Sequence, residues 1–279
     1  MLTLLVMDNL ISIVVPCFNQ GEYLNDSLQS VFDQTHAIWE CIIVDDGSTD
    51  KTREIAASWI EKDNRFKYFY KENGGLCAAR NSGIEISNGS YILPLDADDK
   101  ISKNYIKLAL QEFEKDTNLK VVYCHALKFG KITGAWNLPN YSIDNLAVSN
   151  MIFCSAIYKK ADWEKIGGYD VNMVYGLEDW EFWISMLKNG GEVKKLDEVG
   201  FFYRTKEESM VTNLNDNLSN KMYEYMSVKH ADFFVKHLGS FKSLISTINK
   251  NKKNLDNNKF VINLFCKKLF GFKLFSNSI

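Results

Sequence analysis

Short apolar runs alternate with segments of helical periodicity between residues 11 and 127, and this alternation limits the folds that the chain can adopt. The apolar runs predict strands at 11–16, 39–46, 65–72, 90–96 and 120–127. Apolar residues that repeat on one helix face predict helices at 21–34, 48–62, 75–87 and 102–115. Strands that alternate with such helices form a mostly parallel sheet with helices on both faces. We therefore predict an α/β fold with a Rossmann-like central sheet.

The pattern loosens after residue 127 and changes again near residue 216. Further elements are expected as short strands around 129–136 and 151–158, a helix at 178–191 and a strand at 199–206. Helical and then Lys- and Asn-rich sequence follows from about 216. We therefore predict one domain over residues 1–215, with parts at about 10–127 and 128–215, and a helical, basic extension over 216–279.

The overall charge gives no sign of a polyanionic partner, because 33 Lys and Arg residues nearly balance 35 Asp and Glu residues. A formal net charge of -2 argues against nucleic acid as a partner. The six cysteines include no C-x-x-C pair, and several lie in apolar runs, which is typical of buried thiols in a reducing compartment. We find no signal peptide and no uninterrupted apolar stretch of about 18 residues, so we expect a cytoplasmic protein.

Two adjacent acids follow the second predicted strand, in "VDDGSTD" (44–50). Ligands bind beyond the carboxyl ends of the strands in parallel sheets, so these side chains are candidates for a site. Asp45 and Asp46 are able to accept hydrogen bonds from a nucleobase N–H and a ribose hydroxyl. Helix capping by Ser48 or Asp50 is the alternative, and it explains Asp50 but not the two adjacent carboxylates.

The segment "NGGLCAARNSG" (73–83) joins a glycine turn to the start of a predicted helix. Amide N–H groups at a helix start can face an anion, and Arg80 can reach a phosphate. The segment lacks the Gly-Lys-Ser/Thr ending of a Walker A loop and the G-x-G-x-x-G spacing. It is therefore compatible with an anion site, but with neither of these nucleotide-binding loops.

Three acids in four positions, Asp96, Asp98 and Asp99, follow a buried strand in "YILPLDADD". Like charges this close repel each other, so the cluster needs a positive partner. Asp-x-Asp at a strand end is a compact set of hard oxygen ligands for Mg²⁺ or Mn²⁺, which take further ligands from substrate phosphates. A solvated turn is the alternative. We predict that a divalent cation bridging to a diphosphate supplies the positive charge.

Two further acids, Glu178 and Asp179, lie at a predicted helix start in "GLEDWEFW". Acids are stabilised at this end of a helix, so a structural role explains them without any chemistry. The functional interpretation is a carboxylate base flanked by Tyr175, Trp180 and Trp183 as platforms for a sugar. Either tryptophan is equally compatible with a place in the core.

Taken in order, "IVVPCFN", "VDDGSTD", "NGGLCAARNSG", "LDADD" and "GLEDWEFW" resemble the motifs of glycosyltransferase family 2, the inverting nucleotide-sugar transferases with the GT-A fold. The resemblance covers roughly residues 10 to 210. It implies that about 10–127 binds the nucleotide and about 128–215 binds the acceptor. It also implies a metal-dependent enzyme that moves a sugar from a UDP-sugar to a hydroxyl of a glycan or a lipid-linked saccharide.

The resemblance implies a role for each matching residue. Those that would hold the nucleoside, most often uridine in this family, are Pro16, Phe18, Asn19, Asp45 and Asp46. Arg80 and Asn81 would lie along the nucleotide. Asp96 would touch the ribose or a metal-bound water, and Asp98 would bind the metal. Asp179 would be the base, supported by Glu178.

The last predicted strand departs from the family pattern. Family members often have a histidine two residues after its Tyr-Arg pair, where this chain has Lys206. A histidine ligand to the metal is therefore not expected here. Lys206 or Arg204 would contact the diphosphate directly instead.

The chemistry implied is a single displacement, in which Asp179 takes the proton of the acceptor hydroxyl. Transfer to a polyprenyl phosphate is an alternative within the family. A non-catalytic nucleotide-binding module is an alternative of another class, although it has no need of Glu178 and Asp179. A sugar nucleotidyltransferase would need a glycine-rich, basic loop after the first strand, and "PCFNQGEY" is not one. Lys and Asn richness favours a role in bacterial surface polysaccharide assembly, such as O-antigen or capsule.

The C-terminal segment "NKFVINLFCKKLFGFKLF" (258–275) combines bulky apolar residues with lysines. Residues 257–279 contain no acid. Basic amphipathic segments with aromatic residues lie in the interface of anionic membranes. We therefore predict a peripheral membrane contact through this tail, at the inner face of the cytoplasmic membrane. Packing of the tail on the preceding domain is the alternative.

Overall fold

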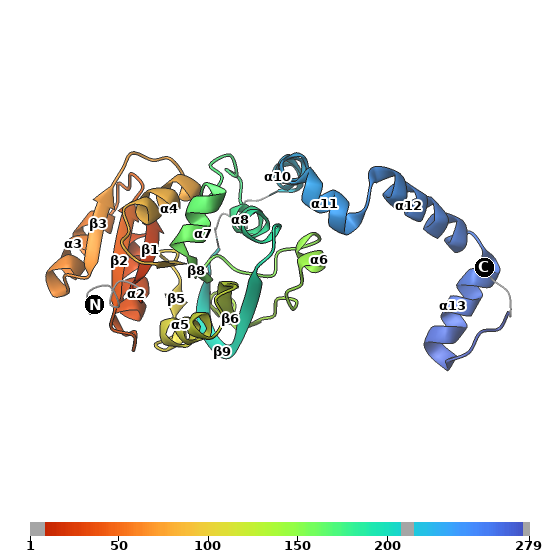
Figure 1. Cartoon of the computed structure of the whole chain (residues 1–279), viewed down its shortest axis with the longest axis horizontal. Helices are drawn as coiled ribbons and strands as arrows, with labels where there is room; N and C mark the ends of the chain where they lie inside the picture. The colour runs from red at the N-terminus through yellow and green to blue at the C-terminus, as the bar shows by residue number, and fades with distance from the viewer. Residues whose placement is uncertain (1–8, 208–214, 276–279) are drawn as a thin grey trace. The chain divides into compact units, whose positions relative to one another are not determined.

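The computed structural model describes residues 9–207 and 215–275, and the chain divides into two compact units, residues 1–229 and 230–279 (Figure 1). Among its described residues, the first unit holds one mixed sheet of nine strands packed against helices, an α/β arrangement. The predicted fold class is therefore confirmed. The predicted domain boundary at 215/216 differs from the division between the units, because helix α10 (Asp216–Lys229) belongs to the first unit.

One half of the sheet is parallel and runs in the order β3-β2-β1-β4. Its strands are β1 (Ile11–Cys17), β2 (Trp39–Asp45), β3 (Phe66–Tyr70) and β4 (Tyr91–Pro94). Every residue of β1 and β2 is buried, as expected for strands covered on both faces. Because Cys17 pairs with Asp45, the turns after β1 and β2 emerge at the same edge of the sheet.

Three helices connect these strands, close to their predicted positions: α2 (Gly21–Phe32), α3 (Thr52–Lys62) and α4 (Leu76–Glu85). Helices α2 and α3 pack against each other, while α4 packs on β1 and β2. Gly83 permits this approach, because a Cβ there would lie 2.5 Å from Val14 Cγ1 and 2.7 Å from Val44 Cγ2. The close packing holds the start of α4 against the carboxyl ends of β1 and β2.

The other half of the sheet is mixed in direction. Its strands are β5 (Lys100–Ile101), β6 (Leu119–Gly130), β7 (Gly134–Trp136), β8 (Ile157–Lys159) and β9 (Glu192–Thr205). Strand β9 runs parallel to β6 and begins before the strand predicted at 199–206. The two-residue strand β5, which was not predicted, pairs antiparallel with Phe201 and Phe202 of β9. This pairing fixes the acidic turn after β4 beside the end of β9.

Helices of this half lie between its strands along the chain. They are α5 (Tyr105–Lys115), α6 (Ile143–Leu146), α7 (Lys160–Ile166) and α8 (Glu178–Leu187). Helices α6 and α7 were not predicted, because four and seven residues are too few to show a helical period. All six cysteines are free and five of them are buried, as predicted.

The described residues of the second unit form helices joined by short turns. It contains α11 (Ala231–Leu238), α12 (Phe241–Leu255) and α13 (Asn258–Phe270). Ser240 and Asn257 cap α12 and α13 by accepting hydrogen bonds from backbone N–H groups. Within residues 9–207 and 215–275, no helix combines the length and the apolar character that crossing a membrane requires.

Candidate active site at the carboxyl ends of the strands

Asp45, which ends β2, is 1% exposed and makes its hydrogen bonds within the protein. Its Oδ1 accepts from the amide of Ser48 at 2.8 Å, and its Oδ2 accepts from the Tyr68 hydroxyl at 2.6 Å. Burial and this hydrogen bond raise the pKa of Tyr68 above its ordinary value. Asp45 therefore fixes the turn after β2 and ties it to β3.

Asp46 also has a structural role, and it is 3% exposed. Its Oδ1 accepts from Lys71 Nζ at 2.6 Å and from the amide of Gly74 at 3.0 Å, and its Oδ2 accepts from the amide of Gly75 at 2.8 Å. We call Asp45 and Asp46 the β2 acidic pair. Each of its four oxygens has a protein partner, so in this conformation the pair does not offer the free acceptors that were predicted for a nucleoside.

The turn after β1 brings three residues predicted to hold the nucleoside to the same edge. Pro16 lies within β1, opposite Val44, and Phe18 is half exposed beyond it. Asn19 adopts a positive φ of 53°, which asparagine tolerates better than most residues. Its Oδ1 accepts from the amide of Thr49 at 2.8 Å, so Asn19 also links this turn to the turn after β2.

Arg80, on α4, bridges the two acidic motifs and is 0% exposed. One terminal nitrogen donates to Asp96 Oδ1 at 2.8 Å and the other to Glu178 Oε1 at 2.8 Å. Burial opposes the charged form, but the charges of Asp96 and Glu178 raise the pKa of Arg80 above its ordinary value. The guanidinium is enclosed by protein in this structure, and the predicted contact of Arg80 with a phosphate stays a prediction.

Asn81, the residue after Arg80, fastens the loop before α8 to α4. Its Nδ2 donates to the carbonyl of Tyr169 at 2.8 Å, and its Oδ1 accepts from the amide of Tyr169 at 2.8 Å and from Trp163 Nε1 at 3.2 Å. These contacts replace the predicted position along the nucleotide. They assign Asn81 to the support of the loop that leads into α8.

The three acids after β4, which we call the β4 acidic cluster, differ from the β2 acidic pair in their partners. Asp98 Oδ2 lies 2.6 Å from Lys206 Nζ, and Asp99 Oδ1 accepts from the amide of Arg204 at 2.7 Å. Arg204 Nε donates to the carbonyl of Asp98 at 2.8 Å. With Arg80 on Asp96, the protein itself therefore supplies the positive partners that the cluster needs.

One buried oxygen of the β4 acidic cluster has no protein partner: Asp99 Oδ2 accepts no hydrogen bond from the described residues. Burial and the charges of Asp98 and Asp96 raise the pKa of Asp99 well above its ordinary value. Burial and the charge of Asp96 also raise the pKa of Asp98, against the effect of Lys206. An unpartnered, buried carboxylate oxygen is costly, and a bound cation would relieve that cost.

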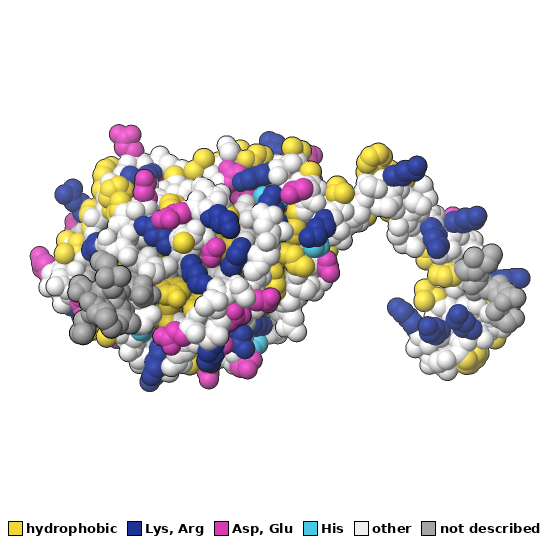
Figure 2. Space-filling model, viewed as in Figure 1, with side chains coloured by type: hydrophobic (Ala, Val, Ile, Leu, Met, Phe, Trp, Pro, Cys, Tyr) yellow, Lys and Arg dark blue, Asp and Glu magenta, His cyan; other side chains and the backbone are white. Residues whose placement is uncertain are grey.

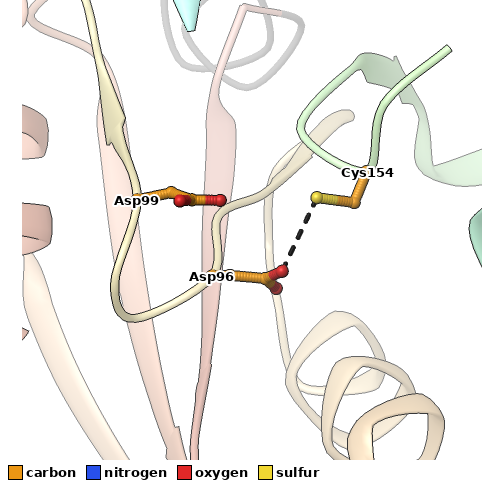
Figure 3. Close-up of side chains that lie close together, drawn as sticks. All are labelled: Asp96, Asp99 and Cys154. Carbon is orange, nitrogen blue, oxygen red and sulfur yellow. Dashed lines mark hydrogen bonds between the residues drawn. The ribbon is translucent and has the colours of Figure 1, made fainter. Parts of the chain in front are cut away.

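Cys154 joins two of these acids in a group whose ligand atoms lie within 4.8 Å of one another (Figure 3). Its thiol donates to Asp96 Oδ2 at 3.6 Å. Burial, first, and the charge of Asp96 raise the pKa of Cys154, so the thiol stays protonated and is a poor ligand for a hard cation. Asp96 and Asp99 fit a hard divalent cation, whereas Cys154 does not. The sequence indicated Cys154 only as an apolar residue.

Asp179, in the first turn of α8, is partly buried beside Glu178. Its Oδ2 accepts from Asn150 Nδ2 at 2.9 Å, and its Oδ1 accepts from the amide of Trp180 at 2.8 Å. Burial and the charge of Glu178 raise the pKa of Asp179 to about 7. A carboxyl group with this pKa can accept a proton near neutral pH, as a general base must. No pattern in the sequence pointed to Asn150.

The tryptophans of α8 are core residues and not sugar platforms. Trp183 is 0% exposed and its Nε1 donates to the carbonyl of Ile152 at 2.8 Å. Trp180 is 7% exposed and its Nε1 donates to the carbonyl of Leu146 at 2.7 Å. Their burial agrees with the alternative of a place in the core, and a platform role for either stays a prediction. Tyr175, at 39% exposure, keeps its side chain open to an acceptor.

A cavity of about 620 Å³ lies between the turn after β1 and the end of β9. Its walls are Phe18, Asn19, Gln20, Glu22, Tyr23, Gly130, Lys131, Arg204, Thr205, Lys206 and Glu207. It therefore brings together two predicted nucleoside contacts, Phe18 and Asn19, and two predicted diphosphate contacts, Arg204 and Lys206. Aromatic side chains and cations in one cavity suit a nucleoside joined to a diphosphate.

Comparison with known proteins gives one family. The family model described as "Glycosyl transferase family 2" matches residues 12–178, more than half of the chain. TuaG of Bacillus subtilis, provisionally named as a teichuronic acid biosynthesis glycosyltransferase, is 29% identical over 232 residues, covering 80% of this chain and 90% of TuaG. The glycosyltransferase GlyG of Streptococcus pneumoniae is 40% identical over 117 residues, but this match spans only 39% of GlyG.

Solved structures share the fold at low sequence identity. TarS 1–349 of S. aureus, in complex with UDP-GlcNAc, has a TM-score of 0.68 at 20% identity, covering 82% of this chain and 71% of TarS 1–349. The mannosyltransferase PcManGT of Pyrobaculum calidifontis, in complex with GDP-Man and Mn²⁺, has a TM-score of 0.59 at 16% identity, covering 72% of this chain and 59% of that chain.

Proposed function

The chain belongs to glycosyltransferase family 2, and from this premise we propose that it transfers a sugar, with inversion, from a nucleoside diphosphate donor to a hydroxyl of a glycan or a lipid-linked saccharide. One observation carries the proposal. The buried Arg80 guanidinium bonds Asp96 and Glu178 at 2.8 Å each. A single side chain thus ties the β4 acidic cluster, at the proposed diphosphate site, to the start of α8, where the base lies.

A UDP-sugar is the proposed donor. The cavity offers Phe18 and Asn19 to a nucleoside and Arg204 and Lys206 to a diphosphate. TarS, whose fold this chain shares, is described in complex with UDP-GlcNAc, which supports uridine as the nucleoside. In this arrangement Pro16 supports the turn, and the β2 acidic pair holds the neighbouring turns in place around the nucleoside.

The proposed reaction is a single displacement. Asp179 Oδ accepts the proton of the acceptor hydroxyl while that oxygen forms a bond to the anomeric carbon. The bond from this carbon to the diphosphate oxygen breaks, and the nucleoside diphosphate leaves with the electron pair. Burial and, second, the charge of Glu178 keep the pKa of Asp179 high, so the base binds the proton well at neutral pH. Tyr175 remains a proposed contact of the acceptor.

We propose Mn²⁺ or Mg²⁺ as cofactor, held by Asp98 and Asp96. The unpartnered Oδ2 of Asp99 supports a cation at this place. When bound, such an ion stabilises negative charge on the departing diphosphate. Asp98 is paired with Lys206 in this structure, so the ion pair has to open before Asp98 can serve as a ligand.

Bacterial surface polysaccharide assembly is the proposed pathway class. TuaG carries a name linked to teichuronic acid biosynthesis, and chondroitin synthase of Pasteurella multocida is 27% identical over 194 residues. Transfer to a polyprenyl phosphate is the alternative acceptor chemistry. A non-catalytic nucleotide-binding module is disfavoured, because it gives no reason for a carboxyl group whose pKa is raised to about 7 at Asp179.

We also propose that the C-terminal tail (258–275), together with the preceding helix α12, contacts an anionic membrane, which would place the enzyme at the inner face of the cytoplasmic membrane. Figure 2 shows hydrophobic and Lys side chains together on the helices of the second unit. On α12, Phe241, Ile245 and Ile248 are more than half exposed, and on α13 Leu269 and Phe270 are each 63% exposed. Basic helices with such exposed residues bind at membrane interfaces.

The transfer proposal is tested with Asp179→Asn. We expect UDP binding, measured by thermal shift with Mn²⁺, to stay unchanged, while transfer falls by ~10²–10⁴, the usual loss for a general base. Transfer by the wild type should rise with pH through about 7, because the base acts when deprotonated. Asp197→Asn, an exposed change on β9, is the control. Lost UDP affinity with retained turnover would make Asp179 a binding residue.

The membrane proposal is tested in the full chain with Leu269→Glu combined with Phe270→Glu. Co-sedimentation with anionic vesicles at low salt should be strong for the wild type and weak for this variant. Val228→Glu on α10, where the side chain is 80% exposed, adds one charge outside the tail and should bind like the wild type. A wild type that ignores the vesicles would refute the proposal.

A further inference from the structure

Lys206 is held as a cation inside the β4 acidic cluster. Its Nζ lies 2.6 Å from Asp98 Oδ2 and 3.1 Å from Gln20 Oε1, and 4.8 Å from the ring centre of Tyr23. Its side chain is 17% exposed and that of Asp98 is 15% exposed. A carboxylate, an amide oxygen and an aromatic face are three partners that an ammonium group prefers. The pair is therefore a built contact and not a chance meeting of surface charges.

The backbone around this pair is fixed by the neighbouring residue of β9. Arg204 Nε donates to the carbonyl of Asp98, and the amide of Arg204 donates to Asp99 Oδ1. Arg204 also reaches Asp26 on α2 at 2.6 Å. Lys206 itself lies beyond the end of β9, on a flexible stem of four carbons. The acids are thus fixed through the backbone, while the ammonium group that neutralises Asp98 is carried on a flexible stem.

The same ammonium group borders the cavity assigned to the donor. Lys206 and Arg204 form part of its wall, together with Phe18 and Asn19. The ammonium group of Lys206, on its flexible stem, can therefore reach an anion bound in the cavity. A second cation at Asp98 would meet Lys206 at a distance where like charges repel strongly. Asp98 can accordingly serve the ammonium group or a metal ion, but not both in the same geometry.

We propose that Lys206 is the resident cation of the β4 acidic cluster, and that it exchanges between two partners: Asp98 in the empty enzyme and the donor diphosphate in the loaded enzyme. This inference rests on the proposed donor and on the proposed role of Asp98 toward a divalent ion. Lys206 then does two things in succession. It neutralises Asp98 while the cavity is empty, and it adds positive charge to the diphosphate when Asp98 is released.

The exchange makes metal and nucleotide binding cooperative. Without nucleotide, binding of a divalent ion at Asp98 has to break the ion pair with no new partner for Lys206. With a diphosphate present, the ammonium group gains a new anion, so the ion binds more tightly. Because such coupling is reciprocal, the ion must strengthen nucleotide binding by the same factor.

The test is the affinity of the full chain for Mn²⁺, measured by the electron paramagnetic resonance signal of free Mn²⁺, with and without UDP. Without UDP, Lys206→Gln should bind Mn²⁺ about tenfold more tightly than the wild type, the change expected when one charge-assisted hydrogen bond need not be broken. UDP should raise the Mn²⁺ affinity of the wild type strongly and that of Lys206→Gln less. Lys67→Gln is the control, because Lys67 pairs with Glu40 at 2.6 Å and, among the described residues, forms no hydrogen bond or ion pair with the β4 acidic cluster.

Equal Mn²⁺ affinities for the wild type and Lys206→Gln without UDP would overturn the exchange and leave the transfer proposal intact. Weaker binding by Lys206→Gln would also overturn it, since Lys206 would then support the ion. If neither protein binds Mn²⁺ and transfer continues in EDTA, the metal assignment and the exchange both fail. Glycosyl transfer itself is decided separately, by Asp179→Asn.

Discussion

The β2 acidic pair and the β4 acidic cluster look alike in sequence but differ in structure. Both follow strands of the parallel half of the sheet. The four oxygens of Asp45 and Asp46 all accept hydrogen bonds, several of them from backbone amides. In the β4 acidic cluster, Asp99 Oδ2 has no partner among the described residues. Asp98 and Asp96 are paired with the side-chain cations of Lys206 and Arg80. Acids at a strand end therefore indicate a ligand site only where some of their carboxylate oxygens have no hydrogen-bond partner in the protein.

Arg80 gives the largest expected effect. Arg80→Met leaves Asp96 and Glu178 without their shared cation inside the protein, which typically costs ~3–5 kcal/mol. Lys71→Met at the β2 acidic pair should cost only about 1 kcal/mol, because Asp46 keeps the amides of Gly74 and Gly75. Urea denaturation of both variants measures the difference. Equal losses would mean that the two acidic motifs depend on their cations to the same degree.

The next effect is that of the β2 acidic pair itself. Asp46→Asn removes the charge that Lys71 and the two glycine amides share, and we expect a loss of ~1.5–3 kcal/mol in unfolding free energy. Donor binding should weaken only to the extent that weaker hydrogen bonds from the amides of Gly74 and Gly75 loosen this turn. The measurement is again urea denaturation, with UDP binding as the second readout. A fully stable variant that no longer binds UDP would restore the original prediction that Asp46 contacts the nucleoside.

The fold could be predicted from the sequence wherever the apolar residues of an element form a clear pattern. Strands β1 and β2 are buried along their whole length, so their apolar runs are unbroken. The prediction missed β5, because two residues are too few to show a pattern. This strand exists only through its pairing with Phe201 and Phe202. The long strand β9 was shortened in the prediction, since its first part mixes exposed and buried residues.

The candidate site was predictable in the types of its residues but not in their partners. Asp98 and Asp179 were found from acids at a strand end and at a helix start. Nothing in the sequence separates a tryptophan that offers its face to a sugar from Trp180, whose N–H bonds a carbonyl of the core. Nor does it show that Arg80 is enclosed between two carboxylates, because these partners come from segments far apart in the chain.

A third substitution, Asp99→Asn, should raise the unfolding free energy, whereas Asp46→Asn should lower it. Asp99→Asn removes one of three crowded charges and replaces the unpartnered Oδ2 with an N–H that can donate to a neighbouring carboxylate. The bond from the Arg204 amide to the remaining oxygen can persist. We expect a gain of up to ~1 kcal/mol in unfolding free energy at pH 7. A loss as large as that of Asp46→Asn would show that both acidic motifs serve the fold alike.

The smallest expected effect is the pH dependence of that gain, and its sign follows from the raised pKa of Asp99. Burial and the charges of Asp98 and Asp96 place this pKa in the folded protein well above the ordinary 3.8. Between the two values the folded protein holds a proton that the unfolded chain has released, so the contribution of Asp99 to stability falls as the pH rises. Below about pH 4 the group is protonated in both states and costs nothing.

The difference in unfolding free energy between Asp99→Asn and the wild type should therefore be close to zero near pH 4 and should grow as the pH rises through the folded pKa. Other carboxyl groups behave oppositely: the hydrogen bonds of Asp170 to Lys229 and Asn172 overcome burial and lower its pKa to about 2. Only the difference between the two proteins isolates Asp99 from these groups. Urea denaturation at a series of pH values gives it. A gain that stays constant with pH would mean that Asp99 is stabilised or destabilised by packing alone, and that the β4 acidic cluster stores no repulsion for a cation to relieve.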